Sequence, residues 1–170
     1  MKNKLIAAAI LLTGFVTYAN AQSTAYATTT AVLVTPISIA KTTDMHFGTV
    51  AASSTAGTVV LDYANGRTKT GGASLPTGGV AVTTAVFTVT GQGSSGFSVA
   101  IPTLPVTLSN GVQTMTVTNF LCDAGAATTL SGGTKVLNVG ATLNVGADQA
   151  AGTYTHAADA TGLFVTVNYN

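Results

Sequence analysis

Apolar residues recur at every second position in much of the sequence, and this period most constrains the possible fold. The longest run covers residues 137–147, where Leu137, Val139 and Leu143 alternate with polar or small residues. A period of two places alternate side chains on one face of a β-strand. We therefore predict a half-buried strand here, or two strands broken at a glycine.

Shorter runs with the same period occur at residues 85–89, 97–101 and 115–119. Turn signals separate the runs, and Asn65-Gly66 and Asn110-Gly111 are the strongest, because Asn-Gly readily takes the two positive-φ positions of a tight hairpin. No stretch has a convincing helical period. About eight to ten short strands with close turns predict an all-β fold, an antiparallel sandwich or Greek-key domain.

Charged residues are scarce: the chain has six Lys or Arg and five Asp among 170 residues, whereas Thr fills 32 positions. Surface helices depend on Glu, Lys, Arg and Gln, so this composition disfavours them. Nucleic-acid affinity depends on clustered Lys and Arg, so we expect no nucleic-acid partner. Hydrophobic residues make up 46% of the chain and can supply a core.

The first 21 residues have the pattern of a secretory signal peptide. Lys2 and Lys4 precede an apolar run at residues 5–16, and Ala19-Asn20-Ala21 is a small-x-small cleavage site. The run is shorter than the roughly 20 residues of a membrane span, so we expect secretion without stable membrane insertion. We divide the remainder into an N-terminal extension, residues 22–30, and one domain, residues 31–170, whose first strand covers residues 31–40.

Residues that would carry catalysis or bind a cofactor are few. Residues 91–96 (GQGSSG) match the dinucleotide fingerprint, but the alternating run that follows predicts a strand and hence a Gly-rich hairpin loop. Asp44 with His46 is at most a weak metal site, and the spacing of His156 and Asp159 brings side chains together on a helix but not on a strand. We predict no catalytic residue, no cofactor and no metal.

The single cysteine, Cys122, cannot form an internal disulfide in the oxidising environment to which the signal peptide points. We interpret it as a small buried apolar residue, although pairing between two chains is an alternative. The neighbouring Asp123 disfavours the thiolate that a nucleophile requires.

The last nine residues, 162–170, form a clean alternating strand. Its apolar face consists of Leu163, Val165, Val167 and Tyr169. Edge strands are normally blunted by Lys, Pro or a cover, and this strand has no such residue. We predict that another strand covers it, either from the same chain or from a second chain by β-strand addition. A possible donor is the uncharged segment that contains Ala25, Tyr26, Ala27, Thr28 and Thr30.

Residues 35–50 (TPISIAKTTDMHFGTV) resemble the opening of the DUF4402 domains of Gram-negative bacteria, and residues 130–133, 139–147, 149–155 and 165–169 resemble their closing part. These domains are similar in pattern to spore coat protein U domains and to chaperone–usher pilin subunits. The resemblance implies an immunoglobulin-like (pilin-like) sandwich that lacks a strand, which the N-terminal extension of a neighbouring subunit completes. The penultimate Tyr169 matches the pilin pattern.

What the resemblance implies is a secreted subunit of a fimbria-like filament on the surface of a Gram-negative cell. Its partners would be other copies of itself, a periplasmic chaperone and an outer-membrane usher. The alternative is a monomeric adhesin or coat-like module that binds through an exposed patch. Tyr63 and a long surface loop predicted at residues 68–79 are the candidates for that patch.

Overall fold

The computed structural model describes residues 21–156, 159 and 161–170. The chain divides into two compact units, Met1–Leu33 and Val34–Asn170. The predicted signal peptide lies outside the described residues except for Ala21, and residues 21–33 are exposed and have no regular secondary structure. Within the described ranges, no helix is long and apolar enough to cross a membrane.

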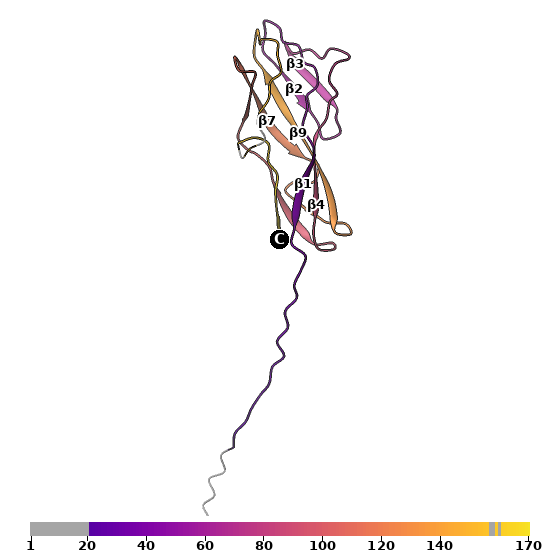
Figure 1. The fold of residues 1–170 in the computed structure, drawn as a ribbon, viewed down its shortest axis with the longest axis vertical. Helices are drawn as coiled ribbons and strands as arrows, with labels where there is room; N and C mark the ends of the chain where they lie inside the picture. Colours follow the sequence, from indigo (N-terminus) through magenta and orange to yellow (C-terminus); the bar gives the residue numbers. More distant parts are fainter. Residues whose placement is uncertain (1–20, 157–158, 160) are drawn as a thin grey trace, which may run out of the picture. The chain divides into compact units, whose positions relative to one another are not determined.

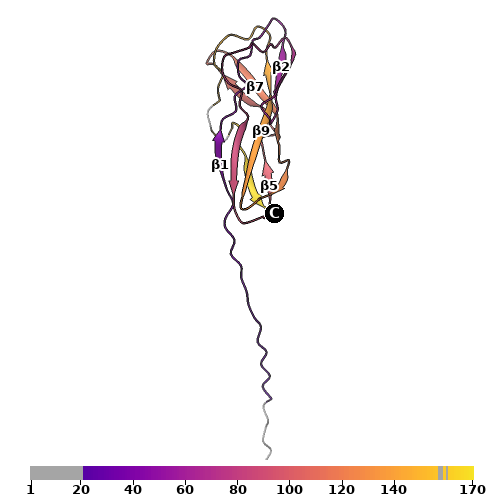
Figure 2. The ribbon, with the colours of Figure 1, turned by 90° about the vertical axis from the view of Figure 1, so that its right-hand side faces the viewer.

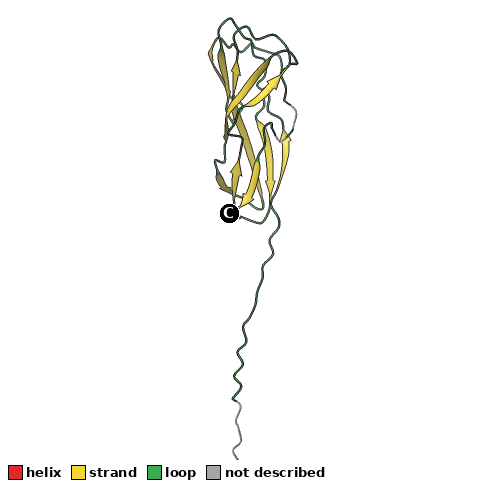
Figure 3. Ribbon diagram, turned by 90° about the vertical axis from the view of Figure 1, so that its left-hand side faces the viewer, coloured by secondary structure: helices red, strands yellow, loops and turns green. Residues whose placement is uncertain are grey.

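The described part of the second unit contains ten strands and no helix (Figure 3). All strand pairings are antiparallel. The predicted all-β antiparallel sandwich is therefore confirmed. The strands are β1 Ser38–Thr43, β2 Gly57–Leu61, β3 Arg67–Gly71, β4 Ala85–Thr90, β5 Gly96–Ala100, β6 Val106–Ser109, β7 Thr114–Cys122, β8 Ala127–Thr129, β9 Thr134–Val145 and β10 Thr166–Tyr169.

Strand β9 is the centre of the larger, seven-stranded sheet (Figure 1). It pairs with β4 and then β2 along one side and with β7 along the other, while β1 follows β4, β3 follows β2 and β6 follows β7. The strand runs unbroken through Gly140, where an added Cβ would lie 2.3 Å from the carbonyl oxygen of Leu61. The close approach of β2 explains the glycine, and the predicted run forms one strand instead of two, although this strand ends at Val145.

The smaller sheet has the strand order β10-β5-β8 and lies in the half of the domain that contains the C-terminus (Figure 2). Alternate residues of both sheets point inward and form one hydrophobic cluster. Leu137 and Val139 contribute from β9, and Phe97 contributes from β5; each of these side chains is fully buried. The period of two thus places one face of each sheet in a shared core.

The outward face of the larger sheet accounts for much of the threonine. A row in register crosses five strands and consists of Thr70, Thr58, Asn144, Thr116 and Thr107. The hydroxyl oxygens of Thr58 and Thr70 lie 2.7 Å apart, and Asn144 Nδ2 donates to Thr116 Oγ1 at 3.2 Å. Neutral hydrogen bonds across the strands therefore stabilise this face without any ion pair in the row.

The two Asn-Gly turns differ from the tight hairpins that we predicted. Only one residue of each pair has a positive φ, which is Asn65 (66°) in the first and Gly111 (89°) in the second. In the first turn, Asp62 Oδ1 accepts hydrogen bonds from the N–H groups of Ala64 and Gly66. A side-chain oxygen that binds turn amides favours a longer connection, here residues 62–66, over a two-residue turn.

Two predicted loops also need correction. Residues 91–96 lead from β4 in the larger sheet to β5 in the smaller one, so they cross between sheets and form no hairpin. A strand and not a helix follows them, as predicted. The surface loop predicted at residues 68–79 begins inside β3, because Arg67–Gly71 pairs with β2 along its whole length.

Candidate functional site

The terminal strand alternates as predicted but is shorter. Only Thr166–Tyr169 is paired as β10, because its partner β5 ends at Ala100, opposite Thr166. Val167 is buried, and Leu163, Val165 and Tyr169 are half-buried. The intervening Phe164, Thr166 and Asn168 are exposed. One face of this segment therefore packs on the core, as the sequence predicted.

Strand β10 has β5 on one side and no strand on the other among the described residues. The backbone N–H of Val99 donates to Ala126, so Val99 directs its main-chain groups away from β10. Val167 lies opposite Val99, and the two therefore form a non-hydrogen-bonded pair. It follows that the N–H and C=O groups of Val167, and those of Tyr169 two residues later, point to the free side of β10.

Strand β1 has a free side for the same reason. The N–H of Gly91 donates to Gly133, just before β9, so Gly91 and Val89 direct their main-chain groups toward β9. Ile39 lies opposite Val89 and therefore directs its N–H and C=O groups away from β4. The side chain of Ile39 is half-buried against the core. Both free sides thus combine unpaired main-chain groups with apolar residues whose side chains point inward.

These two free sides, which we call the β1/β10 edge pair, lie in the same half of the domain (Figure 2). No main-chain hydrogen bond joins the two strands in the described part of the chain. A side chain joins them at one end, where Tyr169 Oη donates to the carbonyl oxygen of Thr35 at 2.8 Å and accepts from the N–H of Gln92 at 2.6 Å. The predicted acceptor residues therefore lie along an edge with unused hydrogen-bonding capacity.

The predicted donor residues Ala25, Tyr26, Ala27, Thr28 and Thr30 are exposed and belong to no strand. The strand predicted at residues 31–40 is wrong at its start, since β1 begins at Ser38. Pro36 has no N–H to donate to a β-ladder, which explains the later start.

The exposed segment consequently extends to Val34 and contains three large apolar residues that we did not assign to it, Val32, Leu33 and Val34. Val32 and Leu33 are 85% and 93% exposed. The proline at position 36 was the signal in the sequence that could have placed them outside the first strand.

A comparison with models of known protein families found a match over nearly all of the second unit. Residues 37–169 match the family described as "Domain of unknown function (DUF4402)". The chain belongs to the DUF4402 family. The match takes in all ten strands of the DUF4402 domain and leaves the exposed segment outside it. No curated protein and no solved structure matched the chain.

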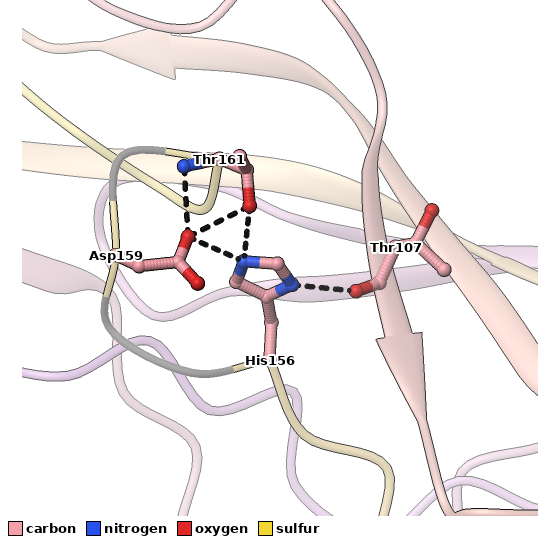
Figure 4. Close-up of polar contacts among 4 residues, drawn as sticks. All are labelled: Thr107, His156, Asp159 and Thr161. Atoms are coloured by element: carbon pink, nitrogen blue, oxygen red, sulfur yellow. Dashed lines mark hydrogen bonds and ion pairs between the residues drawn. The ribbon is translucent and has the colours of Figure 1, made fainter.

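Outside the edge pair, the DUF4402 domain contains a polar cluster centred on His156 (Figure 4). Its Nδ1 lies 2.8 Å from the carbonyl oxygen of Thr107, and its Nε2 lies 3.2 Å from Asp159 Oδ1. Asp159 also accepts from the N–H and the hydroxyl of Thr161. We expected no contact between His156 and Asp159 without a helix, and this was wrong, because the two side chains lie within hydrogen-bonding distance although neither residue is in a helix.

This cluster predicts a pH dependence in the DUF4402 domain. The carbonyl of Thr107, followed by Asp159, raises the pKa of His156 above 6.5, and the Thr161 hydroxyl and N–H lower the pKa of Asp159 to about 2. The raised His pKa gives stabilisation that is complete below 6.5 and is lost as pH rises through the folded-state pKa. The lowered Asp pKa gives stabilisation that is present above 3.8 and is lost as pH falls through about 2.

We therefore expect the His156 contacts to hold best between pH 3.8 and 6.5. An NMR titration of the His156 ring, assigned with a His156→Gln variant, should give a pKa above 6.5. Asp159→Asn should lower that pKa, because it removes the carboxylate. The same His156 pKa with and without the carboxylate would contradict this account.

The other candidate side chains of the DUF4402 domain have local structural contacts. Asp44 forms an ion pair with Lys41, and His46 Nδ1 accepts from the N–H of Gly48 at 2.8 Å. In the ranges that the structure describes, no group of three or more His, Cys, Asp or Glu residues is arranged to hold a metal ion. Asp44 and His46 therefore remain, at most, the weak pair that we described from the sequence.

Cys122 is half-buried at the end of β7, and its thiol is free. Burial, and to a lesser extent the charge of Asp123, raise the pKa of the Cys122 thiol above its ordinary value. The direction agrees with the prediction that this residue is a poor nucleophile. Tyr63, the candidate for a binding patch, is 50% exposed in the turn between β2 and β3.

Proposed function

We propose that this protein is a secreted structural subunit of a fimbria-like filament on the surface of a Gram-negative cell. In this proposal, the N-terminal extension of one copy adds a strand to the β1/β10 edge pair of the next copy. The joint forms by β-strand addition, in which main-chain bonds supply affinity and alternate side chains supply specificity.

The observation that carries this proposal is the free side of β10. Val167 and Tyr169 direct main-chain groups to a side that has no partner strand in the described residues. Residues 163–170 contain no Lys and no Pro, so the sequence of β10 has no residue of the kinds that normally blunt an edge strand. Such an edge favours association with another strand over a solvated monomer.

The occupant that we propose is the extension of a second copy. Residues 21–33 are exposed and carry no charge, and Val32 and Leu33 expose large apolar side chains. Burying a side chain of this size contributes about 1.5–3 kcal/mol, which gives the extension a reason to leave water. As a strand, the extension would have two faces. One face carries Ala25, Ala27 and Leu33. The other carries Tyr26, Thr28, Thr30 and Val32, and one of the two faces would point toward the domain.

The remaining partners follow from the same edge. A subunit with an unpaired edge strand is prone to aggregate before assembly. We therefore propose that a periplasmic chaperone covers the β1/β10 edge pair, and that an outer-membrane usher releases the subunit into the filament. The predicted signal peptide is the basis for placing this process outside the cytoplasm.

Size-exclusion chromatography and negative-stain electron microscopy of the purified mature protein test the proposal. We expect oligomers and filaments that resist mild denaturant, because each joint must lose several main-chain hydrogen bonds at once. A sharp, reversible monomer at every concentration would reject the filament and favour the monomeric binding module, with Tyr63 as the first residue to test.

A further inference from the structure

We infer that the Tyr169 hydroxyl is a clamp that joins the two strands of the β1/β10 edge pair at one end and fixes the register of the strand added there. The inference rests on the proposed function and goes beyond it, because it assigns a positioning role to residues that strand addition alone does not require. The clamp consists of Tyr169, Gln92 and Thr35.

The contacts of the clamp form a closed ring across three segments. Tyr169 Oη donates to the carbonyl oxygen of Thr35, and the N–H of Gln92 donates to Tyr169 Oη. The side chain of Gln92 completes the ring, since its Oε1 accepts from the N–H of Thr35 at 3.2 Å. The ring joins the end of β10, the loop after β4 and the segment before β1.

Gly91 independently supports a specific binding position for the Tyr169 hydroxyl. A Cβ added at Gly91 would lie 2.3 Å from Tyr169 Oη and 3.0 Å from Leu130 Cδ1. The φ angle of Gly91 is outside the positive region, so its backbone conformation does not require glycine. The missing side chain instead provides the space into which the Tyr169 hydroxyl fits.

The position of the clamp explains how it would fix a register. A strand that pairs with Val167 and Ile39 runs along the edge pair toward the clamp. It cannot continue between Thr35 and Tyr169, because these residues are already 2.8 Å apart at their hydrogen-bonded atoms. A stop at this end prevents two-residue slips toward the clamp, which a Thr-rich donor such as residues 24–30 would otherwise permit.

The same residues hold the point where the extension leaves the domain. Val34 lines a surface hollow together with Ser95, Gly96, Tyr169 and Asn170. The N–H of Asn170 also donates to the carbonyl of Gly96 at 3.2 Å, so the last residue of the chain is held beside the clamp. The end of the strand added by a second copy and the start of this copy's own extension are therefore both next to the clamp.

Disulfide trapping in the full mature chain tests the clamp. In a Cys122→Ser background, a cysteine replaces Asn168 on β10, and a second cysteine replaces each residue of the extension in turn. We expect one dominant intermolecular disulfide in the parent protein. With Tyr169→Phe added, we expect the disulfides to spread to positions two residues away, because the hydroxyl that joins Gln92 and Thr35 at this end of the edge pair is gone.

The controls separate this inference from the proposed function. Tyr63→Phe makes the same chemical change on an exposed turn and should leave the disulfide pattern unchanged. Gln92→Ala removes only the side-chain bond to Thr35 and should give an intermediate spread, and it serves as the test if Tyr169→Phe does not fold. One unchanged disulfide position in the clamp variants would overturn the clamp but not the filament. No intermolecular disulfide at any position in the parent protein would overturn both.

Discussion

A mature chain that lacks residues 23–33 is expected to remain monomeric while its domain keeps its stability. These residues belong to no strand and are exposed, so their removal should change the free energy of unfolding by no more than about 0.5 kcal/mol. The loss of assembly should be complete, because the deletion removes both the apolar residues and the main chain of the proposed donor strand. Electron microscopy and thermal denaturation of the same preparation measure the two effects.

Substitutions in a full-length extension test whether assembly depends on the side chains of the extension or only on its presence. Val32→Asp and Leu33→Asp each keep the full length and place a charge on opposite faces of the extension, so the variant whose face meets the apolar edge should reduce assembly strongly. Ser23→Asp introduces the same charge near the start of the extension and should have little effect. Filaments that persist without residues 23–33 would show that the subunits associate through another surface.

The second large effect is expected from Val165→Pro. Val165 has the same parity as Val167, so its N–H should face the free side of β10, and no main-chain partner for it is present among the described residues. Proline removes this N–H and is tolerated at the start of an edge strand. The domain should therefore fold, whereas an added strand would leave a carbonyl unpaired at a cost of about 1–3 kcal/mol, or roughly tenfold to a hundredfold in affinity.

Val165→Ala is the control for this substitution, since it shortens the half-buried side chain but keeps the N–H. Titrating a synthetic peptide of residues 22–34 into the chain that lacks residues 23–33 provides the measurement. We expect Val165→Ala to bind the peptide only slightly more weakly than the parent and Val165→Pro to bind it far more weakly. Equal losses in both variants would mean that side-chain packing, and not main-chain pairing, holds the added segment.

The candidate site shows where sequence reasoning succeeded and where it was insufficient. The alternation of Leu163, Val165, Val167 and Tyr169 predicted which side chains turn inward, because that property repeats every two residues along any strand. The same sequence did not reveal that β10 pairs on one side only. That depends on β5 and β8, whose register with each other and with β10 is set by residues distant in the sequence.

Local chemistry explains the predictions that were wrong. The apolar residues Val32 and Leu33 suggested an early start for the first strand, but Pro36 and its missing N–H decided against it. The contact of His156 with Asp159 is not described by any short-range periodicity, and the second partner of His156 is the carbonyl of Thr107, which lies in β6 and is distant in the sequence. Long-range contacts of this kind depend on the packed domain and are not encoded in a local pattern.

The sequence by itself determined that this protein is built from strands. Its period of two and its turn residues predict strands, and its scarcity of charged residues disfavours helices on a solvated surface. The tertiary structure decided which strands have free sides, how Tyr169 reaches Thr35 and where the exposed segment ends. The physical reason is that burial follows from the local alternation of side chains, whereas the pairing of main-chain edges is a property of all strands folded together.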